Sequence, residues 1–510
     1  HAGRARLAAL AAAPAVAVAL SAYQLAGRSL GFDEGATVAI ASQHGSALWS
    51  AIAHDGGNMS GYYLLVHVLI GAFGDGLAVL RLPSVVATVA TVALVQAIGL
   101  RLFGLRAALI AAILAAVSLP LVYWAQTARA YALMVAFVCA AYLALVAIAQ
   151  DRGSRRHWLL YVAAMTLAMY CSFVALLVVP AQLAVLSRRR DSLRRLATAL
   201  VAVAVLCVPL AVLAAGRGSG QLFWVPRPTK MVETQVLQSL TSAGLAPSFH
   251  HIATTYVTMW GTVAAVVAVL GLTIWRARRG DDARPAALVL AWCALPAALT
   301  FAWSFVGQPI FVPRNLVAST PALALVLAAP LAQALGRRPA ATARGAAALA
   351  AATILLLLLA ARALPVAHAY GVSPEPWDQV TATVLAGSRP GDCIAFYPQD
   401  GRMAFSYYLA REGQGSPVPR SVLPAVAWTV DRPYVESYAT LPASRIPTAT
   451  AGCRRLWLVT SHEGQVNGPA AARAHRAAWI SLDVALEHRF GIGPLRTYGY
   501  AAGIHVQLLR

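Results

Sequence analysis

Residues 28–63 read RSLGFDEGATVAIASQHGSALWSAIAHDGGNMSGYY and lie between two strongly apolar segments, 7–27 and 82–100. The stretch holds the adjacent carboxylates of Asp33 and Glu34, and further on a second polar cluster that contains His54, Asp55 and Asn58. Charged side chains held beside membrane spans are costly and tend to be functional. We therefore expect any chemistry of this chain to be in this loop.

The composition around this loop is that of a membrane protein. Of the 510 residues, 59% are hydrophobic and 12% are charged, whereas soluble globular proteins carry roughly 25% charged residues. The net charge of +21 does not indicate nucleic-acid binding, because the arginines lie in short loops between apolar segments. That placement is typical of the positive-inside rule, in which basic loops set the membrane orientation.

We predict a polytopic α-helical protein of about eleven spans, with the N-terminus in the cytoplasm and the C-terminus outside. In this arrangement the Arg-rich loops all fall inside. Segments 158–170 and 173–186 are kept apart, because merging them would place two Arg-rich loops on opposite faces. The first span also resembles a signal peptide, but in either case the loop after it faces outward. The predicted spans are 7–27, 82–100, 107–123, 132–149, 158–170, 173–186, 197–215, 255–275, 286–304, 316–335 and 346–364.

The hydropathy divides the chain into a transmembrane domain, 1–364, and a C-terminal part, 365–510. The second part alternates helix-like and strand-like segments, which predicts a small extracytoplasmic α/β domain. Its two cysteines, Cys393 and Cys453, could pair if the domain is extracytoplasmic, although the sequence does not settle this. In the first outer loop, segments 37–52 and 62–73 are too short to cross a membrane, and we expect them to form helices that lie in the interface.

The carboxylates of the outer loop are the first candidates for chemistry. A carboxylate at the mouth of a membrane cavity can act as a general base on a hydroxyl. The alternative for Asp33 and Glu34 is an acidic pair at a helix N-terminus, and from the pair alone this alternative is favoured. His54, Asp55 and Asn58 add an imidazole, a carboxylate and an amide to the same loop, but an ordinary Asp-Gly-Gly turn also explains them.

Two arginines depart from the inside bias and form a second candidate group. Arg129 and Arg314 lie at outer membrane boundaries, where a lipid phosphate is a suitable partner for a guanidinium group. Headgroup contact by a snorkelling side chain explains each of them equally well. Arg227 and Lys230, in the long outer loop 216–251, are weaker candidates. No spacing of potential ligands in the sequence indicates a metal site.

Six segments in this order resemble the bacterial relatives of the protein O-mannosyltransferases, which are GT-C glycosyltransferases that use polyprenyl-phosphate sugars. They are FDEGATVAI (32–40), HDGGNMSGYYLLVHVLIGAFG (54–74), LRLPS (80–84), RLFGLRAA (101–108), WAQTARAYAL (124–133) and FVPRNL (311–316). The resemblance covers roughly residues 30–335 and leaves the C-terminal domain uncovered. The chain departs from the family where a Pro-Pro pair is replaced by Gly57-Asn58-Met59, and where the late Arg-Tyr pair is Arg314-Asn315.

The resemblance implies a GT-C fold and an inverting transfer, on the outer face, of a sugar from a polyprenyl-phosphate donor to a hydroxyl. Asp33 and Glu34 are then the catalytic carboxylates: Asp33 is the base, and Glu34, with His54, Asp55 and Asn58, orients the base or the acceptor. The group implied to hold the donor phosphate is Arg129, Tyr131 and Arg314, with Arg227 and Lys230. No cofactor is implied other than the lipid-linked donor, which is a substrate.

The sugar implied first is mannose, and an arabinofuranosyl or other pentosyl unit is the alternative. The acceptor could be a glycolipid, a cell-wall glycan or a protein, and the expected location is the plasma membrane. A flippase or transporter of lipid-linked sugars is the rival from another class, although its usual internal repeats and ionisable residues within spans are not evident. A structural or receptor protein is the third class, against which the ordered motifs argue.

Overall fold

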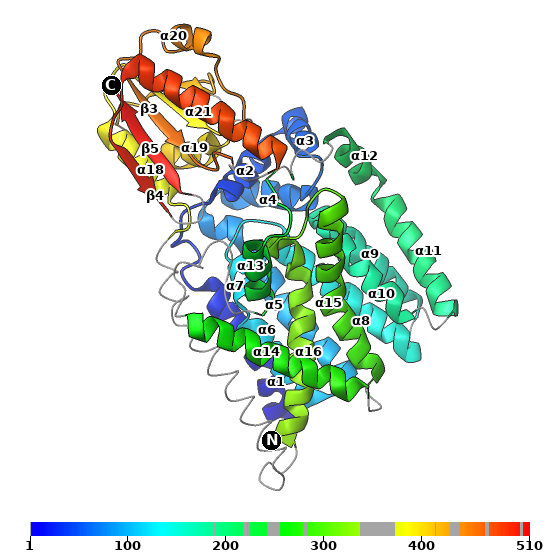
Figure 1. Ribbon diagram of the computed structural model, residues 1–510. Coiled ribbons are helices and arrows are strands. Elements are labelled where there is room, and N and C mark those ends of the chain that lie inside the picture. Colours follow the sequence, from blue (N-terminus) through cyan, green and yellow to red (C-terminus); the bar gives the residue numbers. More distant parts are fainter. Residues whose placement is uncertain are drawn as a thin grey trace.

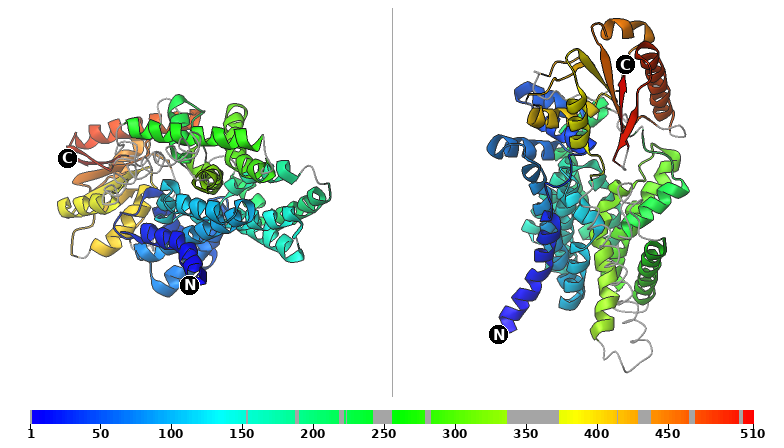
Figure 2. Two further views of the ribbon diagram at one scale, coloured as in Figure 1. Left: turned by 90° about the horizontal axis from the view of Figure 1, so that it is seen from below. Right: turned by 90° about the vertical axis from the view of Figure 1, so that its left-hand side faces the viewer.

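The computed structural model is a bundle of helices with a sheet packed on the end of the bundle opposite the N-terminus (Figures 1 and 2). It describes residues 2–152, 154–186, 190–217, 222, 224–241, 256–278, 283–336, 373–413, 415–428, 438–464, 469–499 and 503–510. The predicted span 346–364 and the predicted domain boundary at 364/365 lie outside these ranges.

Four helical segments among the described residues are long and apolar enough to cross a membrane. They are α5 (Leu77–Phe103), α8 (Tyr131–Ala147) with the π-helical turn η1 (Ile148–Arg152), α15 (Ala283–Val306), and the 3₁₀ turn η5 (Pro313–Ser319) with α16 (Thr320–Gly336). The structure therefore shows a multi-pass helical protein, and the predicted count of eleven spans stays a prediction.

Two further apolar segments are bent helix pairs. The first is α6 (Leu105–Ala116) with α7 (Leu119–Ala125), bent by 56°, and the second is α11 (Arg190–Leu206) with α12 (Val208–Arg217), bent by 58°. Pro120 and Pro209 lie directly after the two breaks, and a proline lacks the N–H that would continue the helix across them. If each pair is one span, six segments can cross a membrane.

The remaining helices of the bundle are shorter or less apolar. The predicted separation of 158–170 from 173–186 is confirmed, because the hydroxyl of Tyr161 donates to Oε1 of Gln182 at 2.5 Å. In one straight helix these residues would be about 30 Å apart, so the chain reverses between them. The shorter or less apolar helices of the bundle are α1 (Ala2–Ala22), α9 (Arg155–Cys171), the 3₁₀ turn η2 (Phe173–Val178), α10 (Val179–Leu186), α13 (Lys230–Leu240) and α14 (Tyr256–Ala277).

The first outer loop folds into three helices, α2 (Phe32–Ala41), α3 (Gly45–His54) and α4 (Ser60–Phe73). The prediction of one helix over 37–52 is wrong, because the segment forms parts of two helices. The first helix ends at Ser42, and α3 begins at Gly45, whose φ is +54°. Glycine takes this left-handed conformation without steric cost. The predicted helix 62–73 is confirmed as α4.

The C-terminal sheet has the strand order β2-β1-β3-β5-β4. Its first three strands in space are parallel, β5 runs antiparallel to β3, and β4 runs antiparallel to β5. Side chains alternate between the faces of a strand. Accordingly Ile394 and Phe396 pack with α18 (Trp377–Gly387) and α19 (Gly401–Glu412), whereas Cys393 and Ala395 pack on the other face with α21 (Ala470–Phe490). The strands are β1 (Asp392–Tyr397), β2 (Arg420–Leu423), β3 (Arg455–Thr460), β4 (Leu495–Tyr498) and β5 (Ile504–Leu509), with short helices η7 (Ala443–Arg445) and α20 (Ile446–Ala449) between β2 and β3.

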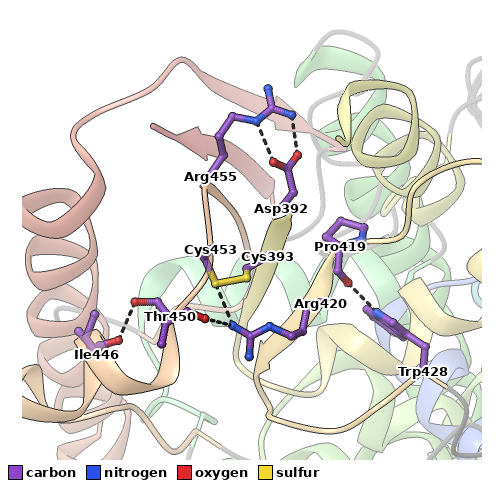
Figure 3. The surroundings of a disulfide bond; sticks show 10 residues. Asp392, Cys393, Pro419, Arg420, Trp428, Ile446, Thr450, Cys453 and Arg455 are labelled. Carbon is purple, nitrogen blue, oxygen red and sulfur yellow. Dashed lines mark hydrogen bonds and ion pairs between the residues drawn. A yellow bond between two sulfur atoms is a disulfide. The ribbon is translucent and has the colours of Figure 1, made fainter. Parts of the chain in front are cut away.

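A disulfide joins Cys393 in β1 to Cys453, just before β3, with 5.6 Å between the Cα atoms (Figure 3). Near it, Arg455 binds Asp392 through Nε at 2.9 Å, and Arg420 donates to the sulfur of Cys453. The pairing that the sequence left open is therefore present, and it ties two neighbouring strands together.

The sheet and its helices dock on the first outer loop through α19. Tyr408 accepts a hydrogen bond from the backbone N–H of Leu30 at 2.7 Å, and Arg411 forms an ion pair with Asp75. Gly35 of α2 lies directly against Ala404, where an added Cβ would be 3.0 Å from a backbone nitrogen. The helix with the predicted catalytic carboxylates is therefore held between the bundle and the C-terminal sheet.

Candidate active site

A cavity of about 1060 Å³ lies where the outer loop, the ends of several bundle helices and the C-terminal sheet meet. Its lining includes Asp33, Asp55 and Asn58 from the outer loop, Arg129 and Tyr131 after α7, and Arg314 at η5. Residues 281 positions apart in the sequence are thus in direct contact at one site.

Asp33 lies in the first turn of α2, where acidic residues are favoured by the helix dipole. The two backbone N–H groups before it are held by other carboxylates: Gly31 donates to Glu34 at 3.0 Å and Phe32 to Glu375 at 2.5 Å. Because these partners cap the helix, the carboxylate of Asp33 is not needed as a cap. It lines the cavity and is 47% exposed.

Two arginines approach that carboxylate. Arg314 Nη1 is 3.2 Å and Arg129 Nη2 is 3.9 Å from the same oxygen of Asp33. Burial works to raise the pKa of Asp33, but the charges of Arg129, Arg314 and His462 outweigh it and hold that pKa below its usual value. Asp33 is therefore an ionised proton acceptor at neutral pH. The structure therefore brings the two candidate phosphate-binding arginines together at Asp33.

Glu34 is placed differently from its neighbour. Its side chain is 7% exposed and forms two hydrogen bonds with the buried Arg81, at 2.9 and 2.8 Å. The backbone N–H of Ala128 adds a third donor at 2.6 Å. These contacts tie α2 to α5 and to the loop that carries Arg129. They favour a positioning role over the predicted catalytic one, because the carboxylate is fully occupied.

Two further guanidinium groups line the cavity. Arg28 donates to Gln126 at 3.0 Å, and Arg217 comes from the end of α12. The guanidinium group of Arg314 stacks on the ring of Trp224, with 4.1 Å to the centroid. We call Arg28, Arg129, Arg217 and Arg314 the arginine wall. Sequence reasoning missed Arg28 and Arg217 as site residues, although Arg28 begins the quoted stretch and both lie in predicted outer loops.

The second polar cluster of the outer loop is divided by the fold. Asp55 and Asn58 line the cavity: Asp55 accepts from the hydroxyl of Tyr63 at 3.0 Å, and Asn58 accepts from the backbone of Phe173 at 3.3 Å. His54 is exposed and lies outside the lining. Gly56 and Gly57 have φ values of +71° and +75°, so the segment also forms the turn that the alternative interpretation predicted.

The other predicted phosphate ligands differ in position. Tyr131 lines the cavity and packs on Trp124 at 4.3 Å between ring centroids. Arg227 and Lys230 are exposed and lie outside the lining, although Trp224 and Met231 on either side of them belong to it. The structure therefore gives Arg227 and Lys230 no contact with the predicted site. Among the described residues, no group of three His, Cys, Asp or Glu side chains is arranged to hold a metal ion.

One side of the cavity comes from the C-terminal sheet, which the sequence did not connect with the site. We call this set the C-terminal wall. Its two histidines and three carboxylates gave no motif, so nothing in the sequence separated them from ordinary surface residues. The wall consists of Glu375, Asp400, Tyr438, His462, Glu463, Arg476 and His505.

Residues 55–214 match the family of dolichyl-phosphate-mannose-protein mannosyltransferases. No curated protein matches the chain by sequence. This family match covers the second half of the outer loop and the helices up to α12, and it includes Asp55, Asn58, Arg129 and Tyr131.

Two solved structures have a fold similar to that of this chain. ArnT from Cupriavidus metallidurans, bound to undecaprenyl phosphate, has a TM-score of 0.51 and 14% identity, covering 96% of both chains. The oligosaccharyltransferase AglB from Archaeoglobus fulgidus, in complex with an inhibitory peptide and a dolichol-phosphate, has a TM-score of 0.54 and 13% identity, covering 98% of this chain and 74% of AglB. The resemblance predicted from the ordered motifs is confirmed: the chain has the fold of the GT-C superfamily of glycosyltransferases.

Proposed function

We propose that the chain is an inverting glycosyltransferase that moves a sugar, in the first instance mannose, from a polyprenyl-phosphate donor to a hydroxyl of an extracytoplasmic acceptor. One observation carries the proposal: the half-exposed carboxylate of Asp33 faces Arg129 and Arg314 within one large cavity. A base and a set of phosphate-binding cations are the two parts that this reaction needs. Both come from segments to which the sequence resemblance assigns these roles.

The reaction is a single displacement at the anomeric carbon. The acceptor hydroxyl attacks that carbon, its proton passes to Asp33, and the bond to the phosphate oxygen breaks with its electron pair leaving on the polyprenyl phosphate. Guanidinium groups of Arg129 and Arg314 stabilise the phosphate where its negative charge grows, as preorganised cations do in a site shielded from water. Because the new bond forms on the face opposite the leaving group, the configuration inverts.

Donor binding also prepares the base. The charges of Arg129 and Arg314 lower the pKa of Asp33, which makes the carboxylate a weak proton acceptor. A phosphate bound between Arg129 and Arg314 shares their charge, and the pKa of Asp33 then rises towards its usual value. The base therefore gains strength when the donor is in place.

The relatives support the lipid carrier. The ArnT structure holds undecaprenyl phosphate and the AglB structure a dolichol-phosphate, and the matched sequence family is named for dolichyl-phosphate-mannose. A transporter or flippase of lipid-linked sugars would share the carrier but would not need the base. The disulfide between Cys393 and Cys453 supports an extracytoplasmic C-terminal domain, because such bonds persist in oxidising compartments. It fits a plasma-membrane enzyme with its N-terminus in the cytoplasm.

The test is transfer by the purified full chain in nanodiscs. It is incubated with polyprenyl-phosphate mannose, polyprenyl-phosphate arabinofuranose or other labelled polyprenyl-phosphate sugars, together with membrane extract as the acceptor source. We expect one labelled donor to be consumed and its sugar to appear, with inverted configuration, on a glycan, glycolipid or protein. Movement of an intact lipid-linked sugar between leaflets without product would instead support the flippase.

A further inference from the structure

The cavity has two chemically different sides. The arginine wall presents four guanidinium groups from the bundle side, which suits an anionic phosphate. The C-terminal wall presents the carboxylates of Glu375, Asp400 and Glu463, with the imidazoles of His462 and His505 and one guanidinium group, that of Arg476. Asp33 lies between the two sides, because its carboxylate is 3.2 Å from Arg314 and the preceding residue, Phe32, contacts Glu375 and His462 of the C-terminal wall.

The C-terminal wall lies where ligands bind in open α/β sheets, at the carboxyl ends of neighbouring strands whose connections leave in opposite directions. The parallel strands β1 and β3 end side by side at Tyr397 and Thr460. After β1 the chain runs through α19 on one face of the sheet, and after β3 through α21 on the other. Asp400 follows the end of β1, and His462 and Glu463 follow the end of β3. This crevice opens into the cavity that contains Asp33.

The polar groups of the crevice are held by one another. Glu463 accepts from the hydroxyl of Thr460 at 2.6 Å and forms an ion pair with Arg476. His462 Nε2 is 3.6 Å from Glu375, and its ring packs on Phe32 at 4.4 Å between centroids. His462 also has φ +50°, a left-handed conformation that is uncommon outside glycine, and such backbone strain concentrates at functional sites.

We propose that the C-terminal wall is the acceptor subsite and that it takes the uncharged, polyhydroxylated end of a glycan; the proposal rests on the proposed function. Carboxylates accept hydrogen bonds and guanidinium groups donate them. The wall can therefore accept a hydrogen bond from the O–H of a sugar hydroxyl and donate one to its oxygen. Phe32 and Tyr438 add ring faces for the apolar faces of a sugar. The three carboxylates outnumber the guanidinium group of Arg476 and the imidazole of His462, which disfavours an anion there.

A peptide acceptor fits the crevice less well. In strand addition, a common mode of peptide recognition, an extended peptide forms main-chain hydrogen bonds with a free sheet edge. The crevice lies at the ends of β1 and β3, which are paired on both sides, whereas the edges of the sheet are β2 and β4. A glycan, which is recognised by side chains at strand ends, needs no edge.

The test compares four ligands on the full chain in nanodiscs. The probes are neutral α-mannotriose and α-arabinofuranotriose, a serine- and threonine-rich peptide, and undecaprenyl phosphate, each titrated separately. The variants are His462→Asn, which keeps a residue that tolerates positive φ, and Glu463→Gln. The matched control is Glu412→Gln, an exposed carboxylate at the end of α19 outside the cavity lining.

We expect the wild-type chain to bind at least one trisaccharide. His462→Asn and Glu463→Gln should each weaken that binding by about tenfold, as the loss of a hydrogen bond to a charged group does, and leave undecaprenyl phosphate binding unchanged. Glu412→Gln should change neither. If Glu463→Gln does not fold, because Arg476 loses its partner, His462→Asn carries the test.

Three results would overturn the subsite: no trisaccharide bound by the wild-type chain, peptide binding that depends on the same side chains, or an equal loss of trisaccharide and undecaprenyl phosphate in the variants. The last would mean that Glu375 and His462 only position α2. Failure of the wild-type chain to bind undecaprenyl phosphate while it binds a trisaccharide would contradict the proposed function and leave the subsite standing.

Discussion

Asp33 and Glu34 are adjacent, but the fold gives their carboxylates different surroundings. Glu34 is buried against Arg81, whose side chain is 2% exposed. Removing one partner of a buried ion pair leaves an uncompensated charge, which costs about 3–5 kcal/mol. We therefore expect Glu34→Gln to lower the free energy of unfolding of the purified chain by about this amount, measured by thermal or denaturant unfolding in detergent.

The control for that prediction removes both charges. Glu34→Gln with Arg81→Met replaces the pair with neutral side chains, and it should recover part of the lost stability because no charge is left buried alone. If Glu34→Gln instead folds as well as the wild type and abolishes transfer, Glu34 is catalytic after all. The positioning role that we derive from its contacts would then be wrong.

The surroundings of Asp33 also predict a pH dependence. Burial by itself would raise its pKa, but Arg129, Arg314 and His462 hold the pKa below the ordinary value of 3.8. Activity should therefore be lost only on acidification through that lowered value, where the base becomes protonated. Arg314→Gln removes one of the charges, so the acidic limb of kcat/KM, which reports the free enzyme, should move to higher pH. An unchanged limb in a folded variant would mean that Arg314 does not act on Asp33.

At the scale of residues, the sequence predicted the centre of the site but not its surroundings. Arg129 and Arg314 were found because each departs from the positive-inside bias, a signal that survives without any alignment. The role of Arg81 was hidden, since its partner Glu34 is 47 positions away and the pair forms only when α2 packs on α5. The same charge argument assigned Arg227 and Lys230 to the phosphate-binding group, but it does not distinguish outer basic residues that face the cavity from those that face solvent.

At the scale of elements, the disulfide in the C-terminal sheet gives the next prediction. It joins residues 60 positions apart, and a cross-link of that length stabilises a fold by about 4 kcal/mol in the chain-entropy account. We expect Cys393→Ser with Cys453→Ser to destabilise the sheet by about this amount, seen as faster amide hydrogen exchange in β1 and β3. The helices of the bundle, which share no link with the bond, serve as the internal control, and equal protection in the two proteins would contradict the prediction.

Helices and strands were predicted well where hydropathy and periodicity are strong, and less well where the chain bends. The strand-like segments around Cys393 and Leu456 became β1 and β3, and the apolar segment 82–100 became the core of α5. The bends after α6 and α11 and the break between α2 and α3 depend on single prolines and a glycine. A proline or glycine of this kind changes the direction of the chain, but the apolar residues continue on both sides of it, so hydropathy does not reveal the bend.

At the scale of the whole molecule, the orientation in the membrane is open to direct measurement. Single cysteines introduced at exposed positions, one in α21 and one near Arg194 in α11, can be labelled from either side of intact cells in a variant without the native thiols. We expect the position in α21 to be labelled from outside and the position near Arg194 only after permeabilisation, as the arginine distribution predicts. Labelling of α21 only after permeabilisation would place the C-terminal sheet inside.

The C-terminal wall shows why the whole site could not be read from the sequence. His462 and Glu463 reach the cavity only because β3 ends beside β1 and because α19 packs on α2. The contacts of α19 with the outer loop join residues more than 300 positions apart, and no local pattern in either segment encodes them. The half of the site on the bundle side, by contrast, follows from motifs near span ends.

The most direct test of the account is transfer by the Asp33→Asn variant in the nanodisc assay with the active labelled donor. The substitution keeps the size of the side chain and removes the proton acceptor, so the variant should fold and bind undecaprenyl phosphate. Transfer should fall by about 10²–10⁴-fold, the usual contribution of a general base. His54→Ala, at an exposed position outside the cavity, should retain transfer. Near-normal transfer by a well-folded Asp33→Asn variant, with loss of transfer in His54→Ala or Asp55→Asn, would contradict the account and move the base to the second cluster.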